Sequence, residues 1–210
     1  MRIHFVRRCV AVLLVVSFWT SSARALSVIA PTFPELVAEA STIVRGKVKA
    51  ISSRKVAGAR GEVIKTFVTF KVSSALKGAR EAEEVTLAFL GGQVGDERLE
   101  VPGMPAFNVG AEDYLFVNAQ NRICPLVGAM HGRYRLVTPQ KAGRPYVARD
   151  DHAPLVQVSD VIKPMRDAGA VNGLSDATER ALSAEEFEQR VRAEIAQPTR
   201  IQPTPTGDRP

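Results

Sequence analysis

The side chains best suited to chemistry in this chain form one short run, Asp150, Asp151 and His152, in the segment RDDHAP. Two carboxylates and an imidazole can transfer protons or bind metals, and His131 is the other histidine that follows residue 25. Because consecutive residues at the end of a strand point in different directions, we interpret RDDHAP as a solvated loop. A hydrolase or metal-dependent enzyme that uses Asp150, His152 and His131 is the alternative function.

The remaining reactive side chains lack the spacing that catalysis or metal binding requires. The segment GLSDA around Ser175 has no expected strand before it and no expected helix after it, unlike a nucleophile elbow. The chain has no HExxH, no CxxC and no cluster of cysteines and histidines. The sequence therefore predicts no catalytic residue, no metal and no cofactor.

Cys124 lies in the apolar segment RICPLVG and is the one cysteine that follows residue 25. It can therefore be buried, or it can form a disulfide with another chain. We favour burial, because free cysteines are among the most buried residue types. A thiol–imidazole pair between Cys124 and His131 would depend entirely on how the chain folds.

A glycine- and proline-rich segment, FLGGQVGDERLEVPGMPAFNVGAEDYLF, runs from residue 89 to residue 116. It contains neither GxGxxG nor GxxxxGK[ST], and its acidic residues would repel a phosphate group. Its repeated return to large apolar residues is typical of a folded joint between strands, with glycines at the corners. The side chains that we predict to contact a ligand there are Met104, Pro105 and Phe107.

The net charge of +6 is weak evidence for a nucleic-acid partner. Four of the 28 basic residues and none of the 22 acidic residues lie in residues 1–25, so the remaining chain has a charge of +2. We therefore expect no binding to nucleic acid, which would need a basic patch. A small basic cluster is expected on a solvated strand face and the adjoining loop, and two of its members, Arg54 and Lys55, are further candidates for contact with a partner.

Residues 1–25 have the three parts of a secretory signal peptide. Arginines form a positive start, an apolar run follows, and the residues ARA match the pattern for cleavage. The apolar run is shorter than the roughly 20 residues that a membrane span needs, so an uncleaved anchor is the less favoured alternative. We expect an exported protein, periplasmic or extracellular, without a membrane contact after cleavage.

The segment after the signal peptide is rich in short apolar–polar alternations. β-Branched and aromatic residues dominate VIKTFVTFKVSSAL, in which Val68, Phe70 and Val72 share one face. The expected strands cover residues 42–52, 63–76, 84–92, 112–119 and 122–128, and a hairpin is expected within 132–150. Short strands with turn signals between them predict a mainly β fold, either an antiparallel OB-like barrel or a compact sandwich.

Two helices are expected beside these strands. The first begins with capping-box spacing at Thr32 and Glu35, and the second begins in the same way at Ser183 and Glu186. Apolar residues of the second recur at helical spacing, which predicts an amphipathic helix that packs on the domain. The expected organisation is a signal peptide at 1–25, a β-barrel domain at 26–165, a linker at 166–181, a C-terminal helix at 182–196 and a disordered Pro/Thr-rich tail at 197–210.

The order of these segments resembles that of a group of secreted bacterial proteins of unknown function. More distantly, AEASTIVRGKV, TFVTFKVSSALKG and VGAEDYLF are similar to the netrin-like modules of tissue inhibitors of metalloproteinases. That resemblance covers roughly residues 35–137 and implies an OB-fold barrel. The inhibitors chelate the protease zinc through an N-terminal cysteine, whereas this chain would begin near Leu26 after cleavage, so the resemblance implies the fold without that mechanism.

Taken together, these patterns favour a secreted, non-catalytic binding module. OB-type barrels bind through one open face and its bordering loops. The expected partner is a protein, for example a secreted protease, or another component of the cell envelope. A purely structural role in the envelope is a further alternative.

Overall fold

The computed structural model describes residues 29–59, 61–118, 120, 123–139, 143–165 and 174–197. The predicted signal peptide, the first half of the predicted linker and nearly all of the predicted tail lie outside these residues. Eight described strands form antiparallel sheets, so the predicted mainly β class is confirmed. Strands of the large sheet follow the order β3-β2-β1-β6-β7-β8, and β4 pairs with β5 in a small second sheet.

The strands are β1 Thr42–Gly58, β2 Gly61–Lys77, β3 Glu84–Leu90, β4 Gly92–Val94, β5 Glu97–Leu99, β6 Glu112–Val117, β7 Arg133–Val137 and β8 Tyr146–Arg149. The helices are α2 Phe33–Glu39, the 3-10 helices η1 Ala129–Gly132 and η2 Val158–Ile162, α3 Leu174–Arg180 and α4 Ala184–Ala196. Helix α3 occupies part of the segment that was expected to be a linker.

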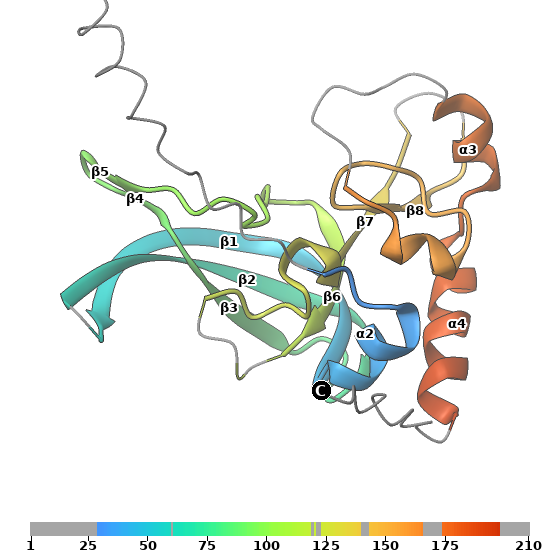
Figure 1. The fold of residues 1–210 in the computed structure, drawn as a ribbon, viewed down its shortest axis with the longest axis horizontal. Helices are drawn as coiled ribbons and strands as arrows, with labels where there is room; N and C mark the ends of the chain where they lie inside the picture. The colour runs from blue at the N-terminus through green and yellow to red at the C-terminus, as the bar shows by residue number, and fades with distance from the viewer. Residues whose placement is uncertain are drawn as a thin grey trace, which may run out of the picture.

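Strands β1 and β2 form a long, curved hairpin, which is the largest unit of the sheet (Figure 1). Strand β1 pairs with β2 over its length and with β6 over its first residues. Its register with β2 shifts between Arg45 and Gly46 and again between Val48 and Ala50, and such bulges bend a strand. A Cβ at Gly46 would lie 3.1 Å from the Cβ of Phe70, so the glycine in this strand also permits a close approach of β2.

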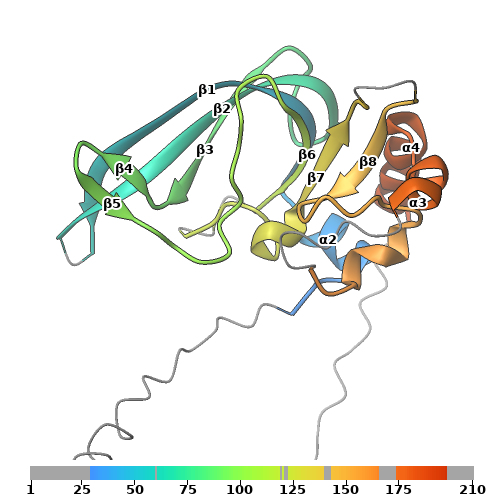
Figure 2. The same ribbon diagram turned by 90° about the horizontal axis from the view of Figure 1, so that it is seen from above.

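The large sheet does not close into a barrel, so that form of the predicted fold is wrong, whereas a compact sandwich agrees with the structure. Strands β3 and β8 lie at opposite ends of the strand order. Between the end of β3 and the segment after β6, one backbone hydrogen bond is formed, from the Leu90 N–H to the Ile123 carbonyl. Beyond β6 the sheet continues into β7 and β8, which helices cover on one face (Figure 2).

Both faces of the sheet are packed, and β6 contributes to each. Tyr114 and Phe116 lie in the core beneath the helices, together with residues of α2 and α4. Leu115 and Val117 lie in the second core, on the opposite face, with residues of β2 and β3. Because both faces are covered, β6 reads as a nearly continuous apolar run rather than an alternating strand.

Of the two hairpins that the sequence predicts after β6, one forms fully. Strands β7 and β8 pair as expected. The segment RICPLVG also runs back along β6, but it contributes a single bridge, between Val117 and Leu126. Pro125 has no N–H to donate, which prevents a continuous ladder at this point.

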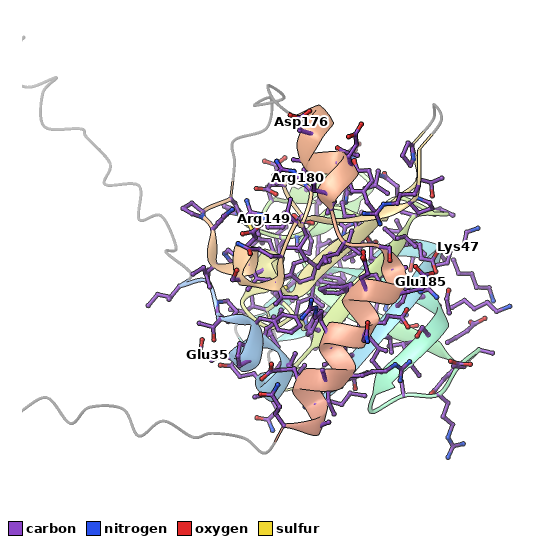
Figure 3. The ribbon with its side chains drawn as sticks, turned by 90° about the vertical axis from the view of Figure 1, so that its right-hand side faces the viewer. Glu35, Lys47, Arg149, Asp176, Arg180 and Glu185 are labelled. Atoms are coloured by element: carbon purple, nitrogen blue, oxygen red, sulfur yellow. The ribbon has the colours of Figure 1, made fainter. Side chains whose placement is uncertain are left out.

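Helix α4 packs across the sheet, as its apolar stripe predicts. Its capping box is present, with the Glu186 N–H bonded to the Ser183 hydroxyl and the Ser183 N–H bonded to the Glu186 carboxylate. Figure 3 shows this helix from outside, with Glu185 on its exposed side. The fully buried Phe187 packs its ring against four other aromatic rings, those of Phe33, Tyr114, Phe116 and Tyr134.

Replacement of Phe187 by alanine should lower the free energy of unfolding by about 3–5 kcal/mol, because it leaves a cavity among these rings. Urea unfolding followed by circular dichroism measures the change. The control is Ile195→Ala on the same helix, where the side chain is 38 % exposed and the expected change is within about 0.5 kcal/mol. Equal effects of the two substitutions would contradict the packing described for α4.

Candidate functional site

The glycine- and proline-rich segment between β3 and β6, residues 91–111, packs against strands β1 and β2 through β4. We refer to this segment as the joint. Between the joint and strands β1, β2 and β3 lies a depression of about 610 Å³, which we call the hollow. Ile51, Val68 and Phe89 line it from the sheet, and Leu99 lines it from β5.

The three predicted ligand contacts of the joint lie together on the wall of the hollow. Pro105 is buried, and Met104 and Phe107 are half-buried. The Phe107 ring packs against two aromatic rings of the sheet, with its centroid 5.4 Å from that of Phe70 and 5.0 Å from that of Phe89. Sequence reasoning thus identified residues that meet in space, and their role in binding stays a prediction.

Hydroxyl groups of the sheet hold the start of the joint in place. The Thr66 hydroxyl donates to the Gly91 carbonyl at 2.8 Å and lies 3.0 Å from the Ser53 hydroxyl. Gly92 has a φ of +128° and passes directly over both side chains, so a larger residue there would collide with them. This glycine pair therefore supports the shape of the hollow by allowing a close backbone approach.

Arg54 and Lys55, the predicted basic contacts, do not line the hollow. The Arg54 guanidinium lies 3.9 Å from the centre of the Phe67 ring. The Lys55 ammonium pairs with the Glu97 carboxylate at 2.5 Å, and this hydrogen bond raises the pKa of Lys55. Lys55 thus links the long hairpin to β5, while Arg54 stays exposed at the surface.

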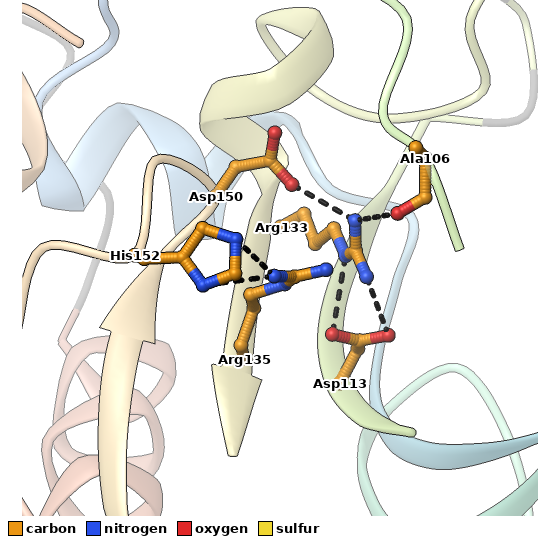
Figure 4. Close-up of polar contacts among 6 residues, drawn as sticks. All are labelled: Ala106, Asp113, Arg133, Arg135, Asp150 and His152. Carbon is orange, nitrogen blue, oxygen red and sulfur yellow. Dashed lines mark hydrogen bonds and ion pairs between the residues drawn. The ribbon is translucent and has the colours of Figure 1, made fainter. Parts of the chain in front are cut away.

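Each residue of the Asp150–His152 run interacts with a different arginine. Asp150 pairs with Arg133 at 2.9 Å, and the His152 ring contacts Arg135 (Figure 4). Asp151 pairs with Arg149 at 2.6 Å. The side chains diverge as expected, but the two carboxylates are largely buried rather than solvated. Among the residues that the structure describes, no three His, Cys, Asp or Glu side chains gather where they could hold a metal.

Arg133 makes four side-chain hydrogen bonds, although it is only 1 % exposed. Its guanidinium donates twice to Asp113, at 3.1 Å each, and also to the Ala106 carbonyl at 2.6 Å. It lies 4.1 Å from the centre of the Phe107 ring. Burial raises the pKa of Asp113, and the positive charge of Arg133 opposes that shift.

The sequence reasoning overlooked Asp113 and Arg133. A signal for them was present, because each is a charged residue inside an apolar strand, in EDYLFV and in RYRLV. Charged residues are almost never fully buried unless they are paired. Two such residues of opposite sign in strands that follow one another indicate a buried ion pair.

The remaining sequence candidates lie in separate places. Cys124 is buried in the second core, as predicted, and burial raises the pKa of its thiol, which disfavours the reactive thiolate. His131 lies in η1 and lines a second, smaller cavity. Ser175 lies within α3.

Substitution of Asp113 by leucine should lower the free energy of unfolding by about 3–5 kcal/mol, because it leaves the Arg133 charge buried without its main partner. The double variant, with Arg133→Met added, should recover most of this loss. Chemical unfolding of the two variants and the wild type measures both effects. A double variant no more stable than Asp113→Leu alone would contradict this assignment.

Two effects hold the pKa of His152 below its ordinary value of 6.5. The larger is partial burial, and the second is the positive charge of the neighbouring Arg135. The unfolded chain therefore takes up this proton more readily, so the contribution of His152 to stability should decrease as the pH falls below 6.5. Substitution of Arg135 by methionine should raise the pKa of His152 part of the way towards that value. Histidine proton signals in an NMR titration report it, with His131 as the internal comparison, and an unchanged His152 curve would contradict the coupling.

No helix among the described residues has the length and apolar character needed to cross a membrane. The chain matches no protein-family model, no curated protein and no solved structure. What the hollow can bind must therefore be inferred from its own side chains.

Proposed function

We propose that the chain is an exported, non-catalytic module that binds a protein partner in the hollow. The observation that carries this proposal is the composition of the hollow's wall. Apolar side chains of the joint and of the curved sheet face one depression, and Ile51 is 37 % exposed beside it. Exposed apolar surface around a formed depression is a common mark of a binding site.

The construction of the wall supports this proposal. The hollow lies within the range of roughly 300–1,000 Å³ that is usual for ligand sites. Phe107 is fixed by two aromatic neighbours and by Arg133, so the wall is formed before any partner arrives. A preformed wall lowers the entropy cost of binding.

The class of partner follows from the sequence. A signal peptide would bring the chain to a compartment that contains secreted proteins and envelope components. The resemblance to netrin-like modules favours a protein partner, with a secreted protease as one candidate. Arg54, exposed on the same hairpin as Ile51, offers a positive charge to an acidic group of such a partner.

The proposal predicts that Ile51→Glu weakens partner binding by at least about tenfold, because it places a charge in an apolar contact. The matched control is Ile195→Glu, since Ile195 is 38 % exposed against 37 % for Ile51 and lies on α4, away from the hollow. Wild type and both variants are immobilised, exposed to proteins exported by the producing cell, and compared by mass spectrometry. The affinity of the recovered protein is then measured by calorimetry.

A partner retained by the wild type and by Ile195→Glu, but lost by Ile51→Glu, supports the hollow as the binding site. Equal retention by all three proteins would locate binding elsewhere. Hydrolysis of ester or peptide substrates by the wild type, abolished by His152→Ala, would instead favour the enzyme alternative that uses the Asp150–His152 region.

A further inference from the structure

A second cavity, of about 440 Å³, shares Pro102 and Met104 with the wall of the hollow and is otherwise lined by different residues. Its wall combines one imidazole with several thioethers. The chain has four methionines, and the three that follow Met1 all line this cavity. The side chains with possible metal-ligating atoms are Met104, Met130, Met165 and His131.

These four residues come from three separate parts of the chain. Met104 belongs to the joint, Met130 and His131 belong to η1, and Met165 follows η2. Methionine is often a simple filler of apolar cores. Here, however, the three methionines come from distant segments and line one cavity together with a histidine. The filling of an apolar core does not require a histidine at that place.

His131 provides the second observation that points to a ligand. The residue is only 8 % exposed, and its buried Nδ1 has no hydrogen-bond partner among the described residues. A neutral imidazole nitrogen is the commonest metal ligand among side chains, so a buried Nδ1 without a partner in a residue that lines this cavity is a candidate ligand.

Local backbone features fix the segments that carry these residues. Gly128 and Ala129, just before Met130, have φ values of +58° and +54°, and such a conformation is unfavourable for alanine. A Cβ at Gly103 would lie 3.3 Å from the terminal methyl of Met130. On the far side, Arg149 donates to the Pro164 carbonyl at 2.9 Å and so fixes the segment that carries Met165.

The set of potential ligands selects for one kind of metal ion. Thioether sulfur and neutral imidazole are soft or intermediate donors, and soft sulfur ligands favour Cu(I). Among the residues that the structure describes, no carboxylate lines the cavity. A divalent ion such as Zn²⁺ or Ca²⁺ would therefore gain no anionic ligand to compensate for its desolvation, whereas a monovalent ion carries a smaller cost.

We propose that Met104, Met130, Met165 and His131 form a binding site for a soft monovalent metal ion, Cu(I), with Ag(I) as its redox-inert substitute. This site shares Met104 with the wall of the partner-binding hollow, whereas Met130, Met165 and His131 do not line the hollow.

The direct test is an anaerobic titration of the purified chain against the coloured Cu(I) complex of bicinchoninate. The wild type should withdraw Cu(I) from the chelator, and added Ag(I) should release it again. Met130→Leu, Met165→Leu and His131→Gln should each weaken binding by at least the roughly 10- to 100-fold that loss of an outer-shell partner costs. Leucine is close to methionine in volume, so the first two variants should keep the fold.

Two control variants test the identity of the site. Cys124→Ala removes the one buried thiol of the described chain, and His152→Gln removes the other described histidine. Both should bind Cu(I) as the wild type does. Thermal unfolding of every variant, with and without Ag(I), verifies the fold and should show a ligand-induced rise in midpoint only where the site is intact.

NMR of ¹³C-methyl-labelled methionine gives a readout that does not depend on substitution. Addition of Ag(I) should shift the methyl signals of Met104, Met130 and Met165 together. A wild type that leaves Cu(I) with the chelator would overturn the proposal, as would binding that survives Met130→Leu and Met165→Leu. Binding that disappears in Cys124→Ala would also overturn it, by assigning the metal to the thiol.

Discussion

The buried pair of Arg133 and Asp113 connects four segments of the structure, including the joint that forms part of the wall of the hollow. Asp113 lies on β6, the strand that joins the long hairpin to the helix-covered strands, and Arg133 begins β7. The same guanidinium holds the joint through the Ala106 carbonyl and the turn after β8 through Asp150. The buried charge of Arg133 needs hydrogen-bond partners, and these come from β6, the joint and the turn after β8. The arrangement of these segments and β7 is therefore the one in which all the partners reach the guanidinium.

This constraint accounts for the way in which the reactive side chains are used. An Asp-Asp-His run is rich in chemistry when it is viewed as sequence, but three arginines occupy its three members. The carboxylates of Asp150 and Asp151 thus neutralise cations that the strands bring inside. The apolar wall of the hollow, with Phe107 stacked on the guanidinium of Arg133, depends on the same neutralisation.

Local patterns in the sequence predicted the local elements well. Both capping boxes, the alternation of β2 and the β7–β8 hairpin depend on neighbouring residues, and all are present. Of the two expected forms, a barrel or a compact sandwich, the structure agrees with the sandwich, because the large sheet does not close. Alternation in the sequence could not decide between the two forms, since closure depends on which strands meet at the sheet edges. Part of the expected linker forms α3, although its sequence has no clear apolar stripe.

The same limit applies to the candidate sites. Met104, Pro105 and Phe107 could be grouped because they are near one another in the chain, and they share one wall. The methionines and His131 of the second cavity come from segments about 60 residues apart at the extremes, so no spacing in the sequence indicated that they would meet. Asp113 and Arg133 were identifiable as charges in apolar strands, but their mutual contact required the fold.

The position of Phe187 also has a consequence for the order in which the chain can fold. Its ring closes a core whose other members include Phe33, Tyr114 and Phe116, and Ser74 hydrogen-bonds to Glu188 beside it, across 114 positions of sequence. During synthesis from the N-terminus, this core stays incomplete until α4 has left the ribosome. Contacts over such distances also slow folding, because the entropy cost of closing the loops is met before the contacts form. A long interval without a finished core is compatible with export of the chain before it folds.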